Sequence, residues 1–180
     1  MRIHKENTVA VLIDIQERLF PVMQNADDLL NNCSILVQGL QELSVHLLVT
    51  QQYTKGLGNT VPELVAVIND FLPIEKTAFS CYSEPAFVEA LEEEDAPNVI
   101  LCGIESHVCV LQTAIDLKEA GYQPIVIFDC VSSRTDFNKQ MALERYRYEG
   151  IMVSSYEAIL FELTQGAKAP EFKAISKLVK

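Results

Sequence analysis

The sequence has no apolar run long enough to cross a membrane. Hydrophobic residues make up 49% of its 180 residues, yet no stretch approaches the ~20 apolar residues that a spanning helix needs. The opening MRIHKENT leads only into the short run VAVLI before Asp14, which is too little for the core of a signal peptide. We therefore expect a soluble, cytoplasmic protein without a membrane partner.

Basic residues are also scarce. The chain has 14 Lys and Arg against 25 Asp and Glu, for a net charge of −11. Binding to a nucleic acid backbone requires clustered Lys and Arg, so no nucleic acid partner is expected. A small-molecule substrate fits this charge better.

The sequence lacks the patterns of disulfide, metal and nucleotide sites. Its five cysteines are odd in number and form no CxxC pair, which favours free thiols in a reducing compartment. The polar loop from Thr50 to Thr60 contains no His, Asp, Glu or Cys, the residues that bind zinc or iron. No Gly-rich phosphate loop is present, which disfavours a flavodoxin-like nucleotide-binding domain. We predict neither a metal nor another cofactor.

The chain does contain a regular alternation of strand-like and helix-like segments. Short apolar runs predict buried strands, and longer segments with apolar residues at helical spacing predict helices. The pattern indicates a single α/β domain over residues 1–180, with a core at about 8–165 and a carboxyl-terminal arm at 166–180. The fold should have three α/β/α layers around a mostly parallel, Rossmann-like sheet of about six strands. Strands are predicted at 8–13, 45–49, 72–79, 98–102, 124–128 and 151–153, and helices at 26–43, 62–71, 83–95, 107–120, 137–149 and 156–164.

The segment NVILCGIESHVCV, residues 98–110, predicts a strand, a tight turn and the start of a helix. Cys109 falls in the first turn of that helix. Unpaired N–H groups and the helix dipole at such a position favour a thiolate and lower the thiol pKa. Cys109 is therefore a candidate nucleophile, although a cysteine is also a common small core residue.

Two charged residues are predicted at the same edge of the sheet as Cys109. Asp14 ends the first strand and Lys76 lies in the extended segment 72–79. Ligands bind beyond the carboxyl ends of parallel strands, where a carboxylate could take the thiol proton and an ammonium could hold the charges. The alternatives are a loop or capping role for Asp14 and a solvated surface position for Lys76.

Four motifs together resemble the isochorismatase-like cysteine hydrolases, and most closely the uncharacterised isochorismatase domain-containing proteins. They are AVLIDIQERL, EKTAFS, VILCGIESHVCV and IVIFDCVSSR, and the similarity extends over about residues 8–165. The resemblance implies a catalytic triad of Asp14, Lys76 and Cys109. It also implies a cis peptide between Ile104 and Glu105, an oxyanion hole formed by the N–H groups of Glu105 and Cys109, and a homo-oligomer.

Two departures narrow the expected activity. Nicotinamidases of this superfamily carry an Asp and His metal cluster where this chain has Gln51, Gln52 and Tyr53, and true isochorismatases lack the nucleophilic cysteine. We therefore expect a cysteine-dependent hydrolase that cleaves a small amide or related acyl compound through a thioester. The alternative is a non-catalytic or redox-active binding or scaffold protein. The candidate substrate-pocket residues are Phe20, Gln51, Tyr53, Tyr82 and His107, and a capping or packing role for His107 is equally compatible with the sequence.

Overall fold

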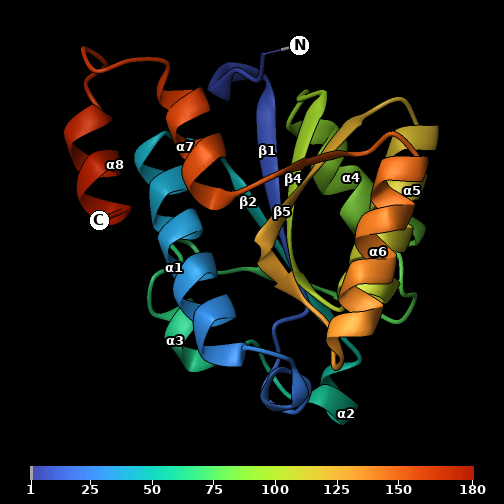
Figure 1. The fold of residues 1–180 in the computed structure, drawn as a ribbon. Coiled ribbons are helices and arrows are strands. Elements are labelled where there is room, and N and C mark those ends of the chain that lie inside the picture. The colour runs from blue at the N-terminus through green and yellow to red at the C-terminus, as the bar shows by residue number, and fades with distance from the viewer. Residues whose placement is uncertain (1) are drawn as a thin grey trace.

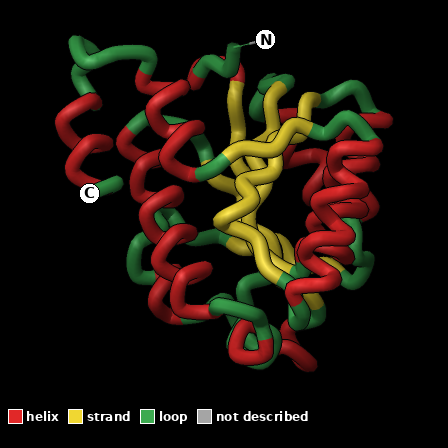
Figure 2. The backbone as a smooth tube through the Cα atoms, viewed as in Figure 1, coloured by secondary structure: helices red, strands yellow, loops and turns green. Residues whose placement is uncertain are grey.

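A six-stranded, all-parallel sheet forms the centre of the computed structural model, which describes residues 2–180. The strand order is β3-β2-β1-β4-β5-β6, and helices cover both faces (Figures 1 and 2). This arrangement confirms the predicted three-layer α/β fold. The strands are β1 (Thr8–Ile13), β2 (Leu47–Gln52), β3 (Pro73–Lys76), β4 (Asn98–Ile104), β5 (Gln123–Ser132) and β6 (Met152–Ser154).

The helices form two layers, each with its own hydrophobic core. On one side of the sheet lie α1 (Ala26–Glu42), α3 (Pro62–Val65), α7 (Tyr156–Thr164) and α8 (Phe172–Leu178). On the other side lie α4 (Pro85–Glu93), α5 (Leu111–Glu119) and α6 (Asp136–Tyr148). Short 3₁₀ turns occur at Lys5–Asn7, Phe20–Val22 and Cys81–Ser83, and α2 (Thr54–Leu57) follows β2.

The central strand β1 shows why these sequences read as continuous apolar runs. Ala10 and Leu12 contact the core beneath α1, whereas Val9, Val11 and Ile13 contact the core beneath α4 to α6. Every residue of β1 is buried, because side chains alternate between two covered faces. The register pairs Ile13 with Thr50 of β2 and Gly103 of β4, so that the carboxyl ends of these strands meet.

Gly103 permits the close approach of β4 to β1. Its φ is +121°, a region that favours glycine. A Cβ atom at this position would lie 2.0 Å from the carbonyl oxygen of Ile13. The β4–β5 register shifts beside this residue, and the chain then leaves the sheet toward Cys109.

Several predicted boundaries were wrong. The segment 62–71 is helical only over α3, the loop 50–60 includes the end of β2 and all of α2, and β5 continues to Ser132. Residues 106–110 form a π-helical turn, so that α5 begins only at Leu111. In each case tertiary pairing or packing overrides the local periodicity.

The carboxyl-terminal arm is a packed element. Ile175 of α8 is fully buried against the α1 side of the molecule, and Lys5 Nζ lies 2.7 Å from Glu171 Oε1. This ion pair therefore links the amino-terminal segment to the carboxyl-terminal arm. No helix within residues 2–180 has the length and apolar character required to cross a membrane.

Candidate active site

A buried ion pair joins the carboxyl ends of β1 and β3. Lys76 Nζ lies 2.6 Å from Asp14 Oδ2, and both side chains are completely buried. Burying two charges is costly unless each finds further polar partners. The structure supplies these partners and so makes the pair tenable.

The ammonium of Lys76 has three neutral acceptors. It donates to Gln52 Oε1 at 2.6 Å and to the carbonyl oxygens of Ala78 and Phe79 at 3.1 Å each. These bonds use all three N–H groups of a lysine. The approach of Asp14 Oδ2 is therefore an ion pair without regular hydrogen-bond geometry, and within the described residues Oδ2 has no hydrogen-bond donor.

Asp14 is held in an unusual backbone conformation directly after β1. Its φ is +52°, its N–H donates to the carbonyl oxygen of Thr50 at 3.3 Å, and its Oδ1 accepts from Thr50 Oγ1 at 2.8 Å. A non-glycine residue in the left-handed region persists only where the surroundings hold it. These contacts leave Oδ2 as the oxygen that faces Lys76.

Cys109 lies in the π-helical turn between β4 and α5. The N–H groups of Val108 and Val110 both donate to the carbonyl oxygen of Glu105, at 3.1 and 3.2 Å. In the part of the chain that the structure covers, the Cys109 N–H bonds to neither the Glu105 nor the Ile104 carbonyl. This irregular turn leaves the amide outside the usual helical ladder.

The peptide bond between Ile104 and Glu105 is cis, as the family resemblance implied. Across residues 2–180, the Glu105 N–H donates no backbone hydrogen bond. The Glu105 side chain accepts from Arg134 Nε at 2.9 Å. The amides of Glu105 and Cys109 thus both lie in the turn that carries the thiol, as an oxyanion hole would require.

The thiol is the resting form of Cys109. Burial is the largest cause that raises its pKa, the negative charge of Asp14 adds to the increase, and the charge of Lys76 opposes it, with a result of about 12. The expectation that the helix start would lower this pKa was wrong, because desolvation of a nearly buried thiol outweighs it. The carboxylate of Asp14 lies close enough to influence the thiol through its charge, as a base for the thiol proton would have to.

Burial acts in opposite directions on the pKa values of Asp14 and Lys76. Burial raises the pKa of Asp14, and the positive charge of Lys76 together with the hydrogen bond from Thr50 offsets part of this increase. Burial also acts to lower the pKa of Lys76, but the negative charges around it, Asp14 first, raise it overall. Lys76 therefore stays protonated, and Asp14 is a stronger base than an exposed carboxylate.

The predicted pocket residues lie in different surroundings. His107 Nδ1 lies 2.9 Å from Ser133 Oγ beside the π-helical turn, and the Tyr53 N–H donates to the Lys76 carbonyl oxygen. Gln51 instead braces Thr60, whose N–H and hydroxyl both donate to Gln51 Oε1. Tyr82 packs edge-on against Tyr122, with ring centroids 6.2 Å apart, and lines a separate hollow with Pro97.

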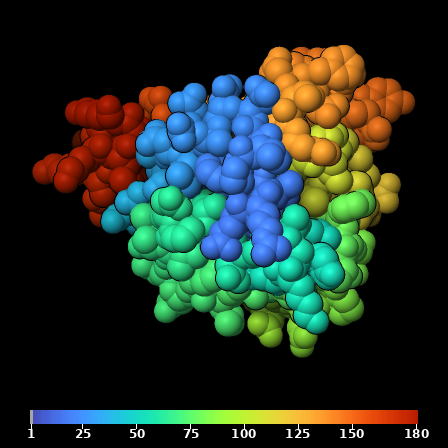
Figure 3. Space-filling view, turned by 90° about the horizontal axis from the view of Figure 1, so that it is seen from below, coloured from blue at the N-terminus to red at the C-terminus, as the bar shows by residue number. Residues whose placement is uncertain are grey.

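Phe20 lies in the 3₁₀ turn after β1 and packs partly against the core beneath α1. Seen from below the sheet, the carboxyl edge is covered by the segments that follow β1, β2 and β5, in blue, teal and orange (Figure 3). Cys109 is 5% exposed, whereas the other four cysteines are fully buried. The Cys109 thiol therefore lies just beneath the molecular surface.

Sequence reasoning missed four residues around the candidate triad. Of these, Thr50, Cys81 and Tyr146 are buried and Gln52 is half-buried. Thr50 contacts Asp14, Gln52 contacts Lys76, and Cys81 Sγ lies 3.8 Å from Thr50 Oγ1. Tyr146 of α6 donates to the carbonyl oxygen of Ser106 at 2.5 Å and so braces the π-helical turn. For Thr50 and Gln52 the signal was their position at the end of β2; nothing local in the sequence indicates Tyr146.

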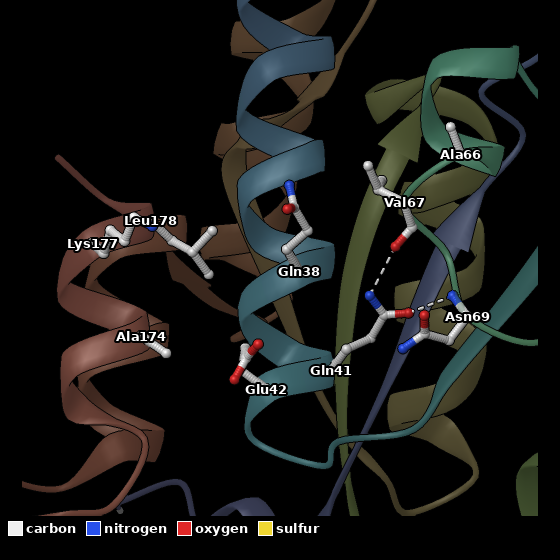
Figure 4. Close-up of a pocket in the computed structure, with 9 residues that line it drawn as sticks. All are labelled: Gln38, Gln41, Glu42, Ala66, Val67, Asn69, Ala174, Lys177 and Leu178. Carbon is white, nitrogen blue, oxygen red and sulfur yellow. Dashed lines mark hydrogen bonds between the residues drawn. The ribbon is translucent and has the colours of Figure 1, made fainter.

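One hollow has none of the candidate catalytic residues in its lining. It measures about 800 Å³ and lies between α1, the segment after α3, and α8 (Figure 4). Gln41 spans one side by bonding to the Val67 carbonyl oxygen and the Asn69 N–H. Among the residues the structure describes, no group of His, Cys, Asp or Glu could hold a metal ion, and the metal-free site remains a prediction.

The family model and the curated relatives point to the same family. The family model "Isochorismatase domain" matches residues 8–158. The chain is 38% identical over 178 residues to isochorismatase domain-containing protein 2 of Danio rerio, covering 99% of this chain and 89% of that protein. It is 36% identical to the secreted isochorismatase effector Isc1 of Phytophthora sojae (strain P6497), covering 99% and 87%.

A solved structure shares both sequence and fold. The MAR1 ribonuclease from Caenorhabditis elegans superimposes with a TM-score of 0.93 at 36% identity, covering 99% of this chain and 92% of that one.

Proposed function

Because this chain belongs to the isochorismatase domain family, we propose that it is a cysteine-dependent hydrolase of small amides or related acyl compounds. The observation that carries the proposal is the buried Asp14–Lys76 ion pair, whose charges act on the nearby Cys109 thiol. A thiol, a base that accepts its proton and a cation that orients the base make up an activated nucleophile.

The first half of the reaction forms a thioester. Asp14 takes the proton from Cys109 as sulfur attacks the substrate's carbonyl carbon, so that no free thiolate needs to accumulate. The oxyanion accepts hydrogen bonds from the N–H groups of Glu105 and Cys109. Protonated Asp14 then gives the proton to the leaving amine, and the carbon–nitrogen bond breaks.

The second half restores the thiol. Asp14, ionised again, accepts a proton from water as the water oxygen attacks the thioester carbon. The carbon–sulfur bond breaks, the acid product leaves, and the proton returns from Asp14 to sulfur. Lys76 stays protonated and fixes the carboxylate throughout.

Intact-mass measurement after screening small amides tests this proposal directly. We expect one acyl group per chain during turnover, carried on the peptide that contains Cys109. Cys109→Ala should give neither adduct nor product, whereas Cys102→Ala, which replaces a buried thiol outside the triad, should retain both. An active enzyme whose Cys109→Ala variant turns over at the wild-type rate would contradict the proposal.

Two other functions are weaker. A relative is named a ribonuclease, but a net charge of −11 opposes binding to RNA phosphates. A scaffold or redox protein has no evident need for a buried lysine paired with a buried aspartate beside the thiol. Incubation with RNA is the matched negative control in the amide screen.

Cytoplasmic location and homo-oligomerisation belong to the same proposal. The first rests on the absence of a long apolar run and the second on the family resemblance, and one relative is described as secreted. Light scattering of the purified protein measures the oligomeric state. A monomer at micromolar concentration would contradict the second expectation.

A further inference from the structure

Thr50 makes two hydrogen bonds to Asp14, the proposed base. It is 1% exposed and lies near the end of β2. Its hydroxyl donates to Asp14 Oδ1 at 2.8 Å, and its carbonyl oxygen accepts from the Asp14 N–H at 3.3 Å. Thr50 therefore holds both the backbone and the carboxylate of Asp14.

Cys81 fixes the direction of this hydroxyl. The thiol of Cys81 donates to Thr50 Oγ1 at 3.8 Å, while the Cys81 N–H is held by Thr113 Oγ1 at 2.9 Å. A hydroxyl has one proton and two lone pairs. With Cys81 filling a lone pair, the proton of Thr50 is directed to Asp14.

We infer that Thr50 is a positioning residue that keeps Asp14 ionised and reserves Oδ2 of the carboxylate for the proton of Cys109. Oδ1 is occupied by Thr50, and Oδ2 has no regular hydrogen-bond donor in the described chain. The two oxygens of Asp14 are thus not equivalent. This inference deepens the proposed function and depends on it for its catalytic meaning, although its effect on Asp14 is measurable without a substrate.

The titration of Asp14 is expected to depend on Thr50. The charged and titratable groups that face Asp14 are Lys76 from β3, Cys109 from the π-helical turn and Cys81 from the turn after β3. A hydrogen bond to an ionised group favours the ionised form. Removing the hydrogen bond from the Thr50 hydroxyl should raise the midpoint of the Asp14 titration by about one to two pH units.

Thr50→Val is the test, because valine keeps the shape and lacks the hydroxyl. We would follow the Asp14 carboxyl by ¹³C NMR, assigning its signal by its loss in Asp14→Asn. The titration midpoint of Asp14 should move to higher pH in Thr50→Val. Thr50→Ser should restore the wild-type midpoint. The matched control is Thr164→Val. Thr164 is a buried threonine whose hydroxyl donates to the Leu160 carbonyl oxygen in α7, and this variant should match wild type.

An unchanged Asp14 midpoint in Thr50→Val would overturn the inference. If that variant does not fold, Cys81→Ala decides, because it frees the Thr50 hydroxyl to rotate and should shift the midpoint in the same direction by a smaller amount. No shift in a folded Cys81→Ala protein then counts against the inference. A shifted midpoint without any acyl adduct would instead leave Thr50 positioning Asp14 and refute the hydrolase proposal.

Discussion

Asp14 is used four times in the proposed reaction, as base for the thiol, acid for the leaving amine, base for water and acid for the departing sulfur. Asn keeps the shape but cannot accept a proton, so Asp14→Asn should lower turnover by ~10²–10⁴-fold. The charge of Asp14 also raises the pKa of Cys109. Alkylation of Cys109 in this variant should therefore persist or quicken while turnover collapses, as parallel steady-state and labelling assays would measure.

A matched control for this variant is Asp129→Asn, because Asp129 is an aspartate within β5 that accepts a hydrogen bond from the Tyr156 N–H. It should retain turnover. If Asp14→Asn hydrolysed substrate at the wild-type rate, Asp14 could not be the base.

Cys109 should be the first of the five thiols to react. It alone retains some exposure, at 5%, whereas Cys33, Cys81, Cys102 and Cys130 have none. Brief iodoacetamide labelling at neutral pH followed by peptide mapping should place most of the label on Cys109. Preferential labelling of any other cysteine would show that the accessible nucleophile lies elsewhere.

Among the structural elements, the turn between β4 and α5 carries most of the site and depends on Gly103. A Cβ atom there would meet the Ile13 carbonyl oxygen at 2.0 Å, and φ is +121°. Gly103→Ala should therefore lower the free energy of unfolding by roughly 3 kcal/mol or more, since strain and overpacking add. Urea unfolding followed by circular dichroism measures this change.

Gly121→Ala separates the effect of backbone strain from that of the steric contact with Ile13. Gly121 also has positive φ, at +94°, but a Cβ atom there meets nothing within 4 Å. Its cost should be limited to backbone strain of about 1 kcal/mol. Equal losses in the two variants would mean that the contact with Ile13 contributes nothing.

Strands could be predicted from the sequence more fully than the site. Val9 to Ile13 face two cores and so form an unbroken apolar run, which is a local signal. The π-helical turn has no such signal, because it depends on Tyr146 reaching Ser106 from 40 residues away. The raised pKa of Cys109 was missed for the same reason: burial and the charge of Asp14 are tertiary effects, whereas the helix-start argument used only neighbours in the chain.

For the molecule as a whole, five buried thiols predict sensitivity to alkaline pH. The pKa is raised from the ordinary 9.0 in all of them, to about 11 for Cys81 and about 12 for Cys109. A group whose folded pKa is raised contributes its full stability below the unfolded pKa and loses it as pH rises through the folded value. Stability should hold up to pH 9 and then fall, by at most about 1.4 kcal/mol per pH unit for each thiol.

Urea unfolding on either side of pH 9 checks this expectation. In Cys102→Ala the alkaline loss should become smaller, even though the variant starts from a lower stability because a buried group is removed. A free energy of unfolding that stays constant above pH 9 would contradict the buried state of the thiols.

Chelators should not affect the enzyme. No metal-binding cluster occurs in residues 2–180, and the proposed chemistry assigns every proton to Asp14, Cys109 or substrate. We expect turnover to be unchanged after EDTA treatment and dialysis. Elemental analysis that finds about one transition metal per chain, lost together with activity, would refute this prediction.

The buried ion pair of Asp14 and Lys76 makes the candidate site electrically neutral, in contrast to the strongly acidic chain. Thiol, carboxylate and ammonium sum to zero charge at rest, and a neutral substrate leaves the sum at zero through the oxyanion and the thioester. The cycle is electroneutral although the chain carries −11. Ionic strength screens exposed charges strongly and buried ones weakly. Salt should therefore alter how fast a charged substrate arrives, while the chemical step proceeds at the same rate.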